Sequence, residues 1–162
     1  MKEQCVTIYT ASIHETVDLG KKVGNALSAG DVIALMGELG CGKTWFTKGL
    51  ALGIGVSSDT IVTSPSFALI NEYEGRHPLF HIDAFRLERL SDFLLAGLDE
   101  YFYQNGIAVL EWADRWPEIL PEWRLKIQFD ILNDHSRKIM LSGYNPRSVK
   151  ILEDLIKGDI VV

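Results

Sequence analysis

The stretch of sequence that decides the fold is VIALMGELGCGKT, residues 32–44. Its first five residues are all apolar, which is typical of a strand buried on both faces of a parallel sheet. The next eight, Gly37-Glu38-Leu39-Gly40-Cys41-Gly42-Lys43-Thr44, fit the pattern G-x-x-x-x-G-K-[ST]. Its glycines let successive backbone N–H groups turn inward around phosphate oxygens, and a helix that begins near Lys43 adds its partial positive charge. The stretch therefore predicts a phosphate-binding loop between a buried strand and a helix.

Three side chains of this loop invite specific interpretations. Lys43 can reach the β- and γ-phosphates of a nucleotide, and the Thr44 hydroxyl can bind Mg²⁺. Cys41 lies close to a helix N-terminus, where a thiol can gain thiolate character. We favour the alternative, in which Cys41 is a small residue that fills a tight loop.

A phosphate loop also needs a carboxylate that holds the metal and positions water. Two candidates directly follow predicted strands: Asp83 comes after residues 79–82, and Glu111 after the apolar run at 107–110. We assign Glu111 to Mg²⁺, directly or through water, and Asp83 to the attacking water or to the metal. A helix cap or a surface ion pair is the alternative for each, and the residues alone do not divide the roles.

Other polar and aromatic side chains lie near these motifs. His81 is a strand histidine with a satisfied hydrogen bond or a catalytic base, and we favour the first. Arg86 and Arg115 can stabilise phosphate charge or form salt bridges. Trp112 is expected to pack beside the site or to gate it. Three hydroxyls can contact the γ-phosphate, as in switch loops, or serve as turn residues: Thr63, Ser64 and Ser66.

The remaining pattern predicts one α/β domain over residues 1–162. Further strands are expected at 5–10, 67–73, 76–82, 125–131 and 138–141. Helices are expected at 12–28, from 43 to about 53–55, from 91, and near the C-terminus. Ser12 and Glu15 match a capping box, and the inner face of the helix that they begin should contain Ile13, Val17, Val23 and Leu27. Because strands alternate with helices before a strand-rich stretch, we predict a P-loop NTPase-like three-layer domain with a mixed, mostly parallel central sheet.

The composition excludes several classes of protein. With 162 residues, 47% of them hydrophobic, the chain can bury a core without disulfides or structural metals. Its 2 cysteines make no disulfide framework and lack zinc spacing. A net charge of −6 argues against a nucleic-acid footprint over the whole surface. Because we find no export signal and no apolar run long enough for a membrane span, we expect a soluble cytoplasmic protein.

Taken in order, these motifs resemble the TsaE (YjeE) family, small P-loop ATPases of bacterial tRNA threonylcarbamoyladenosine modification. The resemblance covers nearly the whole chain and rests on residues 37–44, 63–67, 81–87, 97–102 and 111–115. The phosphate loop alone is shared by many families. Its combination with His81-x-Asp83-x-Phe85-Arg86 and with Glu111-Trp112 is specific.

The resemblance implies a Mg²⁺-dependent ATPase that is slow alone and works with the proteins TsaD and TsaB. That pair transfers the threonylcarbamoyl group to adenosine 37 of tRNA, and ATP hydrolysis would reset the complex for further turnovers. This chain would contact tRNA indirectly, through the complex. Catalytic roles are implied for Lys43, Asp83 and Glu111, and Mg²⁺ binding for Thr44 and Glu111. Besides the loop, the residues implied to contact ATP are Trp45, Thr10, Ser12 and Arg137. Trp45 and Phe85 depart from the family's usual Thr and Tyr.

Other functions share part of this evidence. A small-molecule kinase would have the same size, loop and fold, although Arg86, Arg89 and Arg115 are too scattered to indicate an arginine-bearing lid. A nucleotide-gated binding module would differ from an ATPase only in rate. A GTPase is disfavoured because the sequence has no N-K-x-D motif.

Overall fold

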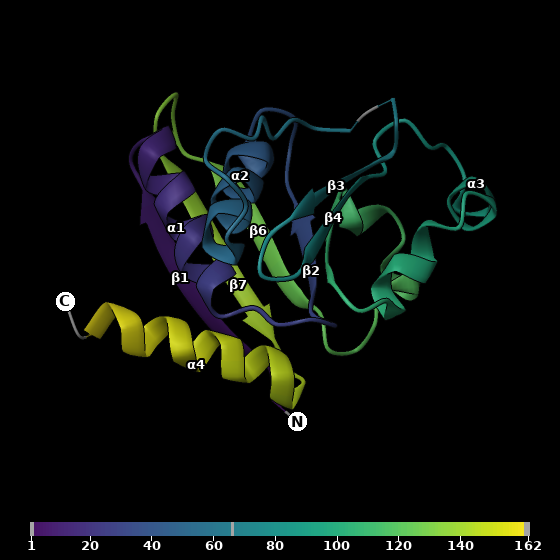
Figure 1. The fold of residues 1–162 in the computed structure, drawn as a ribbon. Helices are drawn as coiled ribbons and strands as arrows, with labels where there is room; N and C mark the ends of the chain where they lie inside the picture. Colours follow the sequence, from purple (N-terminus) through teal and green to yellow (C-terminus); the bar gives the residue numbers. More distant parts are fainter. Residues whose placement is uncertain (1, 66, 161–162) are drawn as a thin grey trace.

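The structure, a computed structural model, describes residues 2–65 and 67–160. Ser66, one of the three predicted phosphate-sensing hydroxyls, lies outside these residues. The described strands form one sheet with the order β1-β7-β6-β2-β5-β4-β3 (Figure 1). Their bounds are β1 Gln4–Thr10, β2 Val32–Met36, β3 Ile70–Glu74, β4 Pro78–Asp83, β5 Ile107–Glu111, β6 Leu125–Ile131 and β7 Arg137–Gly143.

The parallel pairs of this mixed sheet lie at its centre. β2 is parallel to both β5 and β6, and β4 is parallel to β5. The outer strands β3, β7 and β1 join through antiparallel pairs. All five residues of β2 are buried, as its continuous apolar run predicts. The phosphate loop therefore begins at the carboxyl end of the most central strand, where ligands of α/β sheets commonly bind.

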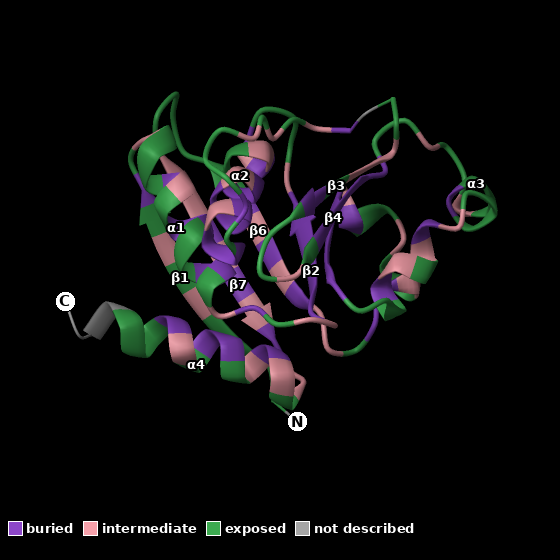
Figure 2. Cartoon of the chain, viewed as in Figure 1, coloured by how far each residue is buried: buried purple, intermediate pink, exposed green. Residues whose placement is uncertain are grey.

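Helices cover both faces of the sheet. They are α1 Ile13–Asn25, α2 Lys43–Ile54, α3 Leu90–Leu95 and α4 Pro146–Ile160, with short 3₁₀ turns at Leu98–Tyr103, Ala113–Arg115 and Pro117–Ile119. Alternate residues of β2 enter two separate cores. Ile33 and Leu35 pack into the core under α1 and α2, and Ala34 packs with Phe93 and Phe102 on the opposite face. Buried residues accordingly follow the central strands and the inward sides of the helices (Figure 2).

Glycines bring α1 and α2 into backbone contact. A Cβ atom on Gly49 of α2 would lie 2.1 Å from the carbonyl oxygen of Val17, and one on Gly20 of α1 would lie 2.3 Å from that of Phe46. One turn further along, a Cβ atom on Gly24 or Gly53 would likewise lie 2.5 or 2.3 Å from a carbonyl oxygen of the other helix. The crossing fixes the direction of α2, and hence the position of the loop at its N-terminus.

This crossing also changes the predicted inner face of α1. Val23 is buried as predicted, but Ile13 is 55% exposed. The other buried residues of the helix are Thr16, Leu19, Gly20 and Gly24. α1 ends at Asn25, so Leu27 is buried beyond the helix rather than on it. An apolar periodicity does not reveal a face that packs through glycine, because glycine carries no side chain to count.

Two strands begin later than predicted. β3 starts at Ile70 because residues 67–69 form a turn, and the Leu69 N–H donates a 2.7 Å bond to the Pro65 carbonyl oxygen. β4 starts at Pro78, because the side chain of Arg76 turns away to bind backbone carbonyl oxygens of other elements. Its guanidinium donates to the carbonyl oxygens of Gly24 and Gly53, near the C-terminal ends of α1 and α2, and to that of Leu27 just beyond α1.

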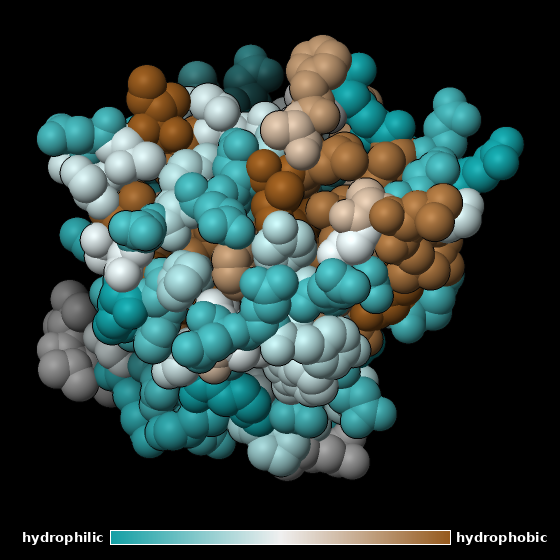
Figure 3. Space-filling view, turned by 45° about the vertical axis from the view of Figure 1, so that its right-hand side comes forward, coloured by the Kyte–Doolittle hydropathy of each residue, from teal (hydrophilic) through white to brown (hydrophobic). Residues whose placement is uncertain are grey.

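The surface also carries apolar side chains. Figure 3 turns the α3 side of the molecule forward, and apolar side chains gather on its right-hand part. Among the exposed apolar residues are Leu94 and Leu95 of α3. Within the described residues, none of the helices is long and apolar enough to cross a membrane.

Candidate active site

The predicted phosphate loop joins β2 to α2. Gly37, Gly40 and Gly42 have φ angles of 148°, 79° and 110°, a region that residues with a side chain rarely adopt. Gly42 is the N-cap of α2, so the first N–H groups of this helix have no intrahelical acceptor and are available to an anion. The loop therefore has the backbone geometry that the sequence motif predicts.

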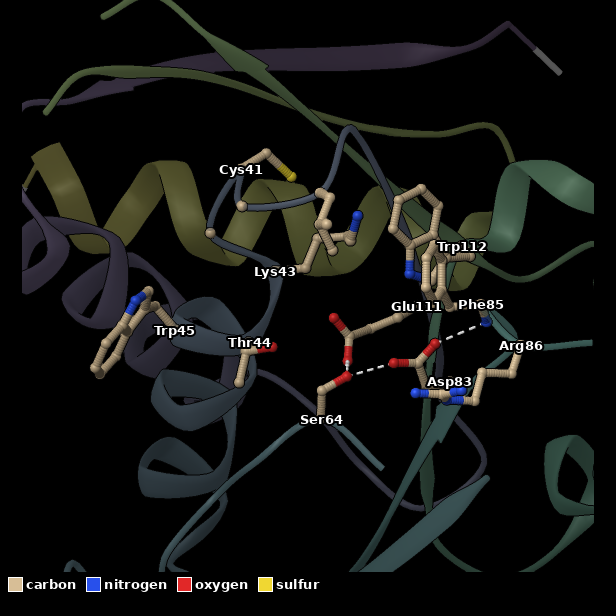
Figure 4. Close-up of a pocket in the computed structure, with 13 residues that line it drawn as sticks. Cys41, Lys43, Thr44, Trp45, Ser64, Asp83, Phe85, Arg86, Glu111 and Trp112 are labelled. Carbon is tan, nitrogen blue, oxygen red and sulfur yellow. Dashed lines mark hydrogen bonds between the residues drawn. The ribbon is translucent and has the colours of Figure 1, made fainter. Parts of the chain in front are cut away.

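A pocket of about 380 Å³ opens beside the loop (Figure 4). Its walls come from residues 39–45 of the loop and α2, from Ser64, from the end of β4 with Phe85 and Arg86, and from Glu111 with Trp112. The structure thus brings together the loop and both predicted carboxylates, although as many as 74 sequence positions separate them. Thr63 does not line this pocket.

The two carboxylates lie side by side at the carboxyl ends of neighbouring strands. Asp83 of β4 and Glu111 of β5 are register partners, and each is 2% exposed. The hydroxyl of Ser64 contacts both: it lies 3.1 Å from Glu111 Oε2 and is hydrogen-bonded to Asp83 Oδ2. Asp83 Oδ1 accepts a 2.8 Å bond from the Phe85 N–H (Figure 4). One hydroxyl thus joins two buried acid groups that face the pocket.

His81 supports this pair from behind. It is fully buried, and its Nε2 lies 2.6 Å from Glu111 Oε2. This hydrogen bond ties the imidazole to the carboxylate oxygen that the Ser64 hydroxyl also contacts. Nδ1 has no hydrogen-bond partner among the described residues. His81 does not line the pocket. Of its two interpretations, the geometry therefore favours a hydrogen-bonded strand histidine, which orients Glu111.

Lys43 is buried at the opposite wall of the pocket. Its Nζ donates to the carbonyl oxygens of Gly37 and Glu38, at 2.5 and 3.3 Å, and lies 3.6 Å from the ring centroid of Trp112. Trp112 has a φ of 64°, a left-handed conformation that is strained for a bulky residue. This conformation turns the indole toward the lysine directly after Glu111. The contact with Lys43 could not be predicted from the sequence, because no spacing rule connects the two residues.

A second pocket, of about 210 Å³, lies beside Gly40–Gly42 and is lined by Ser12 and Arg137. Arg137 Nε donates a 3.0 Å bond to the carbonyl oxygen of Cys41. Trp45 lines both pockets and is 44% exposed. Thr10 lines neither pocket, since its buried hydroxyl bonds that of Thr16 at 2.9 Å.

The thiol of Cys41 is fully buried within the loop. Burial raises the pKa of this thiol, and the nearby charge of Lys43 lowers it by less. A raised pKa keeps the thiol protonated near neutral pH, so it lacks the character of a reactive thiolate. This agrees with the interpretation of Cys41 as a small residue that fills the loop.

The two candidate arginines occupy different environments. Arg86 lines the main pocket, and its guanidinium carbon lies 3.7 Å from the centroid of the Phe67 ring. Arg115 lies outside the pocket and donates to the carbonyl oxygens of Ala84 and Leu87. Arg115 therefore holds the backbone after β4 in place, whereas Arg86 remains a candidate for binding phosphate in the pocket.

The donors at the pocket fit the magnesium ion that the resemblance implies. Mg²⁺ is usually held in phosphate sites by one or two oxygen ligands from the protein, together with water and the phosphates. The Thr44 hydroxyl and the Glu111 carboxylate offer oxygen atoms of this kind, and both residues line the pocket. The described residues contain no cluster of three or more His, Cys, Asp or Glu side chains that could hold a metal by themselves.

Comparison with known protein families identifies relatives of this chain. Residues 10–139 match the family described as "Threonylcarbamoyl adenosine biosynthesis protein TsaE". The chain belongs to the TsaE family. Two curated relatives are named "tRNA threonylcarbamoyladenosine biosynthesis protein TsaE". The one from Treponema pallidum is 41% identical over 131 residues, 81% of this chain and 96% of that protein. The one from Bacillus subtilis is 40% identical over 151 residues, 93% of each.

A solved structure extends the likeness to the fold. The crystal structure of Bacillus subtilis YdiB matches with a TM-score of 0.84 and 35% sequence identity, over 98% of this chain and 99% of that one. The resemblance to TsaE and the α/β fold class that the sequence predicts are thus both confirmed.

Proposed function

We propose that this member of the TsaE family is a Mg²⁺-dependent ATPase in tRNA threonylcarbamoyladenosine modification, and that it supports turnover of the TsaD–TsaB transferase. The observation that carries the ATPase assignment is the position of Lys43 and Thr44 across one pocket from Asp83 and Glu111. The family supports the pathway, because its members are named for threonylcarbamoyladenosine biosynthesis. The acidic net charge favours contact with tRNA through partner proteins rather than alone.

In this proposal each residue has a separate task. The loop amides and the Lys43 ammonium hold the phosphates, and Thr44 and Glu111 hold the metal, which when bound neutralises charge on the phosphates. Asp83 orients the attacking water. Its Oδ1 is held by the Phe85 amide, whereas Oδ2 contacts the mobile proton of a serine hydroxyl. The second pocket, with Ser12, Trp45 and Arg137, takes the nucleoside end of ATP.

Hydrolysis of ATP, measured with and without Mg²⁺, tests the proposal. The chain would be assayed alone and with matching TsaD and TsaB, and Lys43→Ala and Glu111→Ala should each abolish the activity. Lys48→Ala is a matched control, since Lys48 lies on the same helix and lines neither of the two pockets. Glu118→Ala, at an exposed glutamate outside the pocket, is the control for Glu111.

A slow Mg²⁺-dependent rate that rises with the partners and disappears in both site variants would support the whole proposal. An active TsaD–TsaB pair that leaves the rate unchanged would contradict the role in turnover. Transfer of the γ-phosphate to a small acceptor would instead indicate the kinase alternative. Tight ATP binding with no release of phosphate would indicate a binding module.

A further inference from the structure

The pocket contains two positive side chains, one on each wall. Among its described lining residues, only Lys43 and Arg86 carry a positive charge, and Asp83 and Glu111 carry negative charges. Lys43 belongs to the loop side, where its ammonium contacts loop carbonyl oxygens. Arg86 follows β4, and Figure 4 shows it beside Asp83, across the pocket from Lys43. A phosphate group between the walls would therefore meet a cation from each side.

The guanidinium of Arg86 is available for hydrogen bonds. Among the described residues its partner is the Phe67 ring, 3.7 Å from the guanidinium carbon, and no acceptor bonds its N–H groups. A ring contact uses the face of the planar guanidinium, whereas its N–H donors point outward in the plane. Phe67 thus restricts the side chain without using the groups that bind phosphate. Arg115 differs, since backbone carbonyls already occupy its donors.

We propose that Arg86 is a catalytic residue, which stabilises negative charge on the phosphoryl group that ATP transfers to water, and that Phe67 is the positioning residue for its guanidinium. This inference rests on the proposed ATPase function. In the step, the water oxygen forms a bond to the γ-phosphorus while the bond from that atom to the bridging oxygen breaks. ADP leaves with the electron pair, and the water passes its proton to the departing phosphate. In the transition state negative charge spreads over the phosphoryl oxygens. An arginine of the same chain can stabilise this charge by donating hydrogen bonds to those oxygens.

Phe67 links this arginine to the carboxylates. It lies three residues after Ser64, whose hydroxyl contacts Asp83 and Glu111. The same short loop therefore places a hydroxyl between the acid groups and an aromatic ring under the arginine. The Phe67 side chain is 82% exposed, so packing in the core does not explain its position.

The experiment compares transition-state and ground-state binding. The variants are Arg86→Ala, Arg86→Lys and Phe67→Leu, with Arg89→Ala as the control, since Arg89 is exposed, close in sequence and outside the pocket. Single-turnover hydrolysis gives the rate. Calorimetric titration of the protein with ADP, in the presence of Mg²⁺, gives its affinity for ADP. The same titration with aluminium fluoride added gives its affinity for a complex that imitates the phosphoryl group in transfer. Thermal unfolding shows that each variant is folded.

Arg86→Ala should lower the rate by about 100-fold or more, because an arginine in this role contributes roughly 10³-fold or above in related enzymes. It should remove the tighter binding of ADP with aluminium fluoride and leave the affinity for ADP within about 3-fold, since only the former imitates transition-state charge. Arg86→Lys should rescue little, because an ammonium lacks the planar fork. Phe67→Leu should lower kcat by about 10-fold with KM unchanged, as expected when orientation alone is lost.

Each contrary result has a definite meaning. Wild-type hydrolysis by Arg86→Ala overturns the inference and leaves the proposed ATPase intact. Equal losses of affinity for ADP and for ADP with aluminium fluoride make Arg86 a ground-state ligand and also overturn it. A Phe67→Leu variant with normal kcat removes the positioning role. A wild-type chain that neither binds ADP nor hydrolyses ATP overturns the proposed function, and the inference with it.

Discussion

Asp83 and Glu111 are register partners at the ends of β4 and β5, and the hydroxyl of Ser64 contacts an oxygen of each. A hydroxyl has one hydrogen, so it can donate to one of two ionised carboxylates at a time. The other acid group then lacks this donor, although Glu111 is also hydrogen-bonded to His81 Nε2 and Asp83 accepts from the Phe85 N–H. The pair is therefore one donor short at the position of Ser64, where a cation would contact both acid groups.

Ser64→Ala should reveal this shortage. Removal of the hydroxyl leaves two buried carboxylates without their shared partner, so we expect a loss of about 1–3 kcal/mol of stability. The loss should shrink when Mg²⁺ and ADP are present, because the metal then neutralises the same oxygens. Chemical denaturation with and without Mg²⁺·ADP measures both values, and Ser58→Ala, a serine outside the main pocket, is the control. Equal losses under both conditions would contradict the idea.

The glycine crossing of α1 and α2 leads to a second prediction. Gly49→Ala would place a methyl group 2.1 Å from the Val17 carbonyl oxygen, so one helix must move. We expect a loss of roughly 1–3 kcal/mol or more, with weaker nucleotide binding because α2 carries the phosphate loop. The same change at Gly158 of α4 meets no atom within 4 Å and should be neutral or slightly stabilising. Urea unfolding of both variants tests the contrast.

The thiols should differ in reactivity. Cys5 is exposed, whereas Cys41 is buried and has a raised pKa. In the folded protein a thiol reagent should therefore label one cysteine quickly at pH 8, and in denaturant it should label two. Because the folded state keeps the Cys41 proton, ionisation of this thiol in the unfolded chain reduces stability as the pH rises above the unfolded pKa. Rapid labelling of a native Cys5→Ser variant would show that the loop opens.

Arg147 should anchor the C-terminal helix. Its Nε and one terminal nitrogen donate to the two oxygens of buried Asp31, at 2.8 and 2.7 Å, and the carboxylate raises the pKa of the arginine further. Arg147→Ala should cost about 1–3 kcal/mol, less than a fully buried pair because the arginine is one-third exposed. Lys150→Ala removes the exposed pair with Asp154 on the same helix and should change stability little. Comparable losses in both variants would disprove the anchor.

Much of the site could be predicted because its residues follow recognisable elements. The apolar run of β2 leads into the loop, and the two carboxylates end neighbouring strands, so sequence position alone places them at one edge of the sheet. The separate roles of Arg86 and Arg115 could not be predicted, since they depend on carbonyl groups that only the folded chain brings near.

The features of the fold that were predicted wrongly have a similar cause. The inner face of α1 and the start of β4 depend on close contacts with α2, made by glycine backbone in one case and by Arg76 in the other. Neither contact is accompanied in the sequence by an apolar periodicity or a turn signal from which it could be predicted. Local patterns locate elements well, but they do not show which residues a neighbouring element will use.

The bond from Arg137 to the phosphate loop has one more consequence. The arginine begins β7 and reaches the Cys41 carbonyl oxygen, although 96 positions separate the two residues in the sequence. The outer wall of the loop is therefore supported by the turn between β6 and β7. Changing the length of that turn would shift the guanidinium and release the loop carbonyl. Asp134 and His135 of the same turn also line the second pocket, so the tolerance of this surface turn to insertion is limited by the proposed nucleotide site that it helps to form.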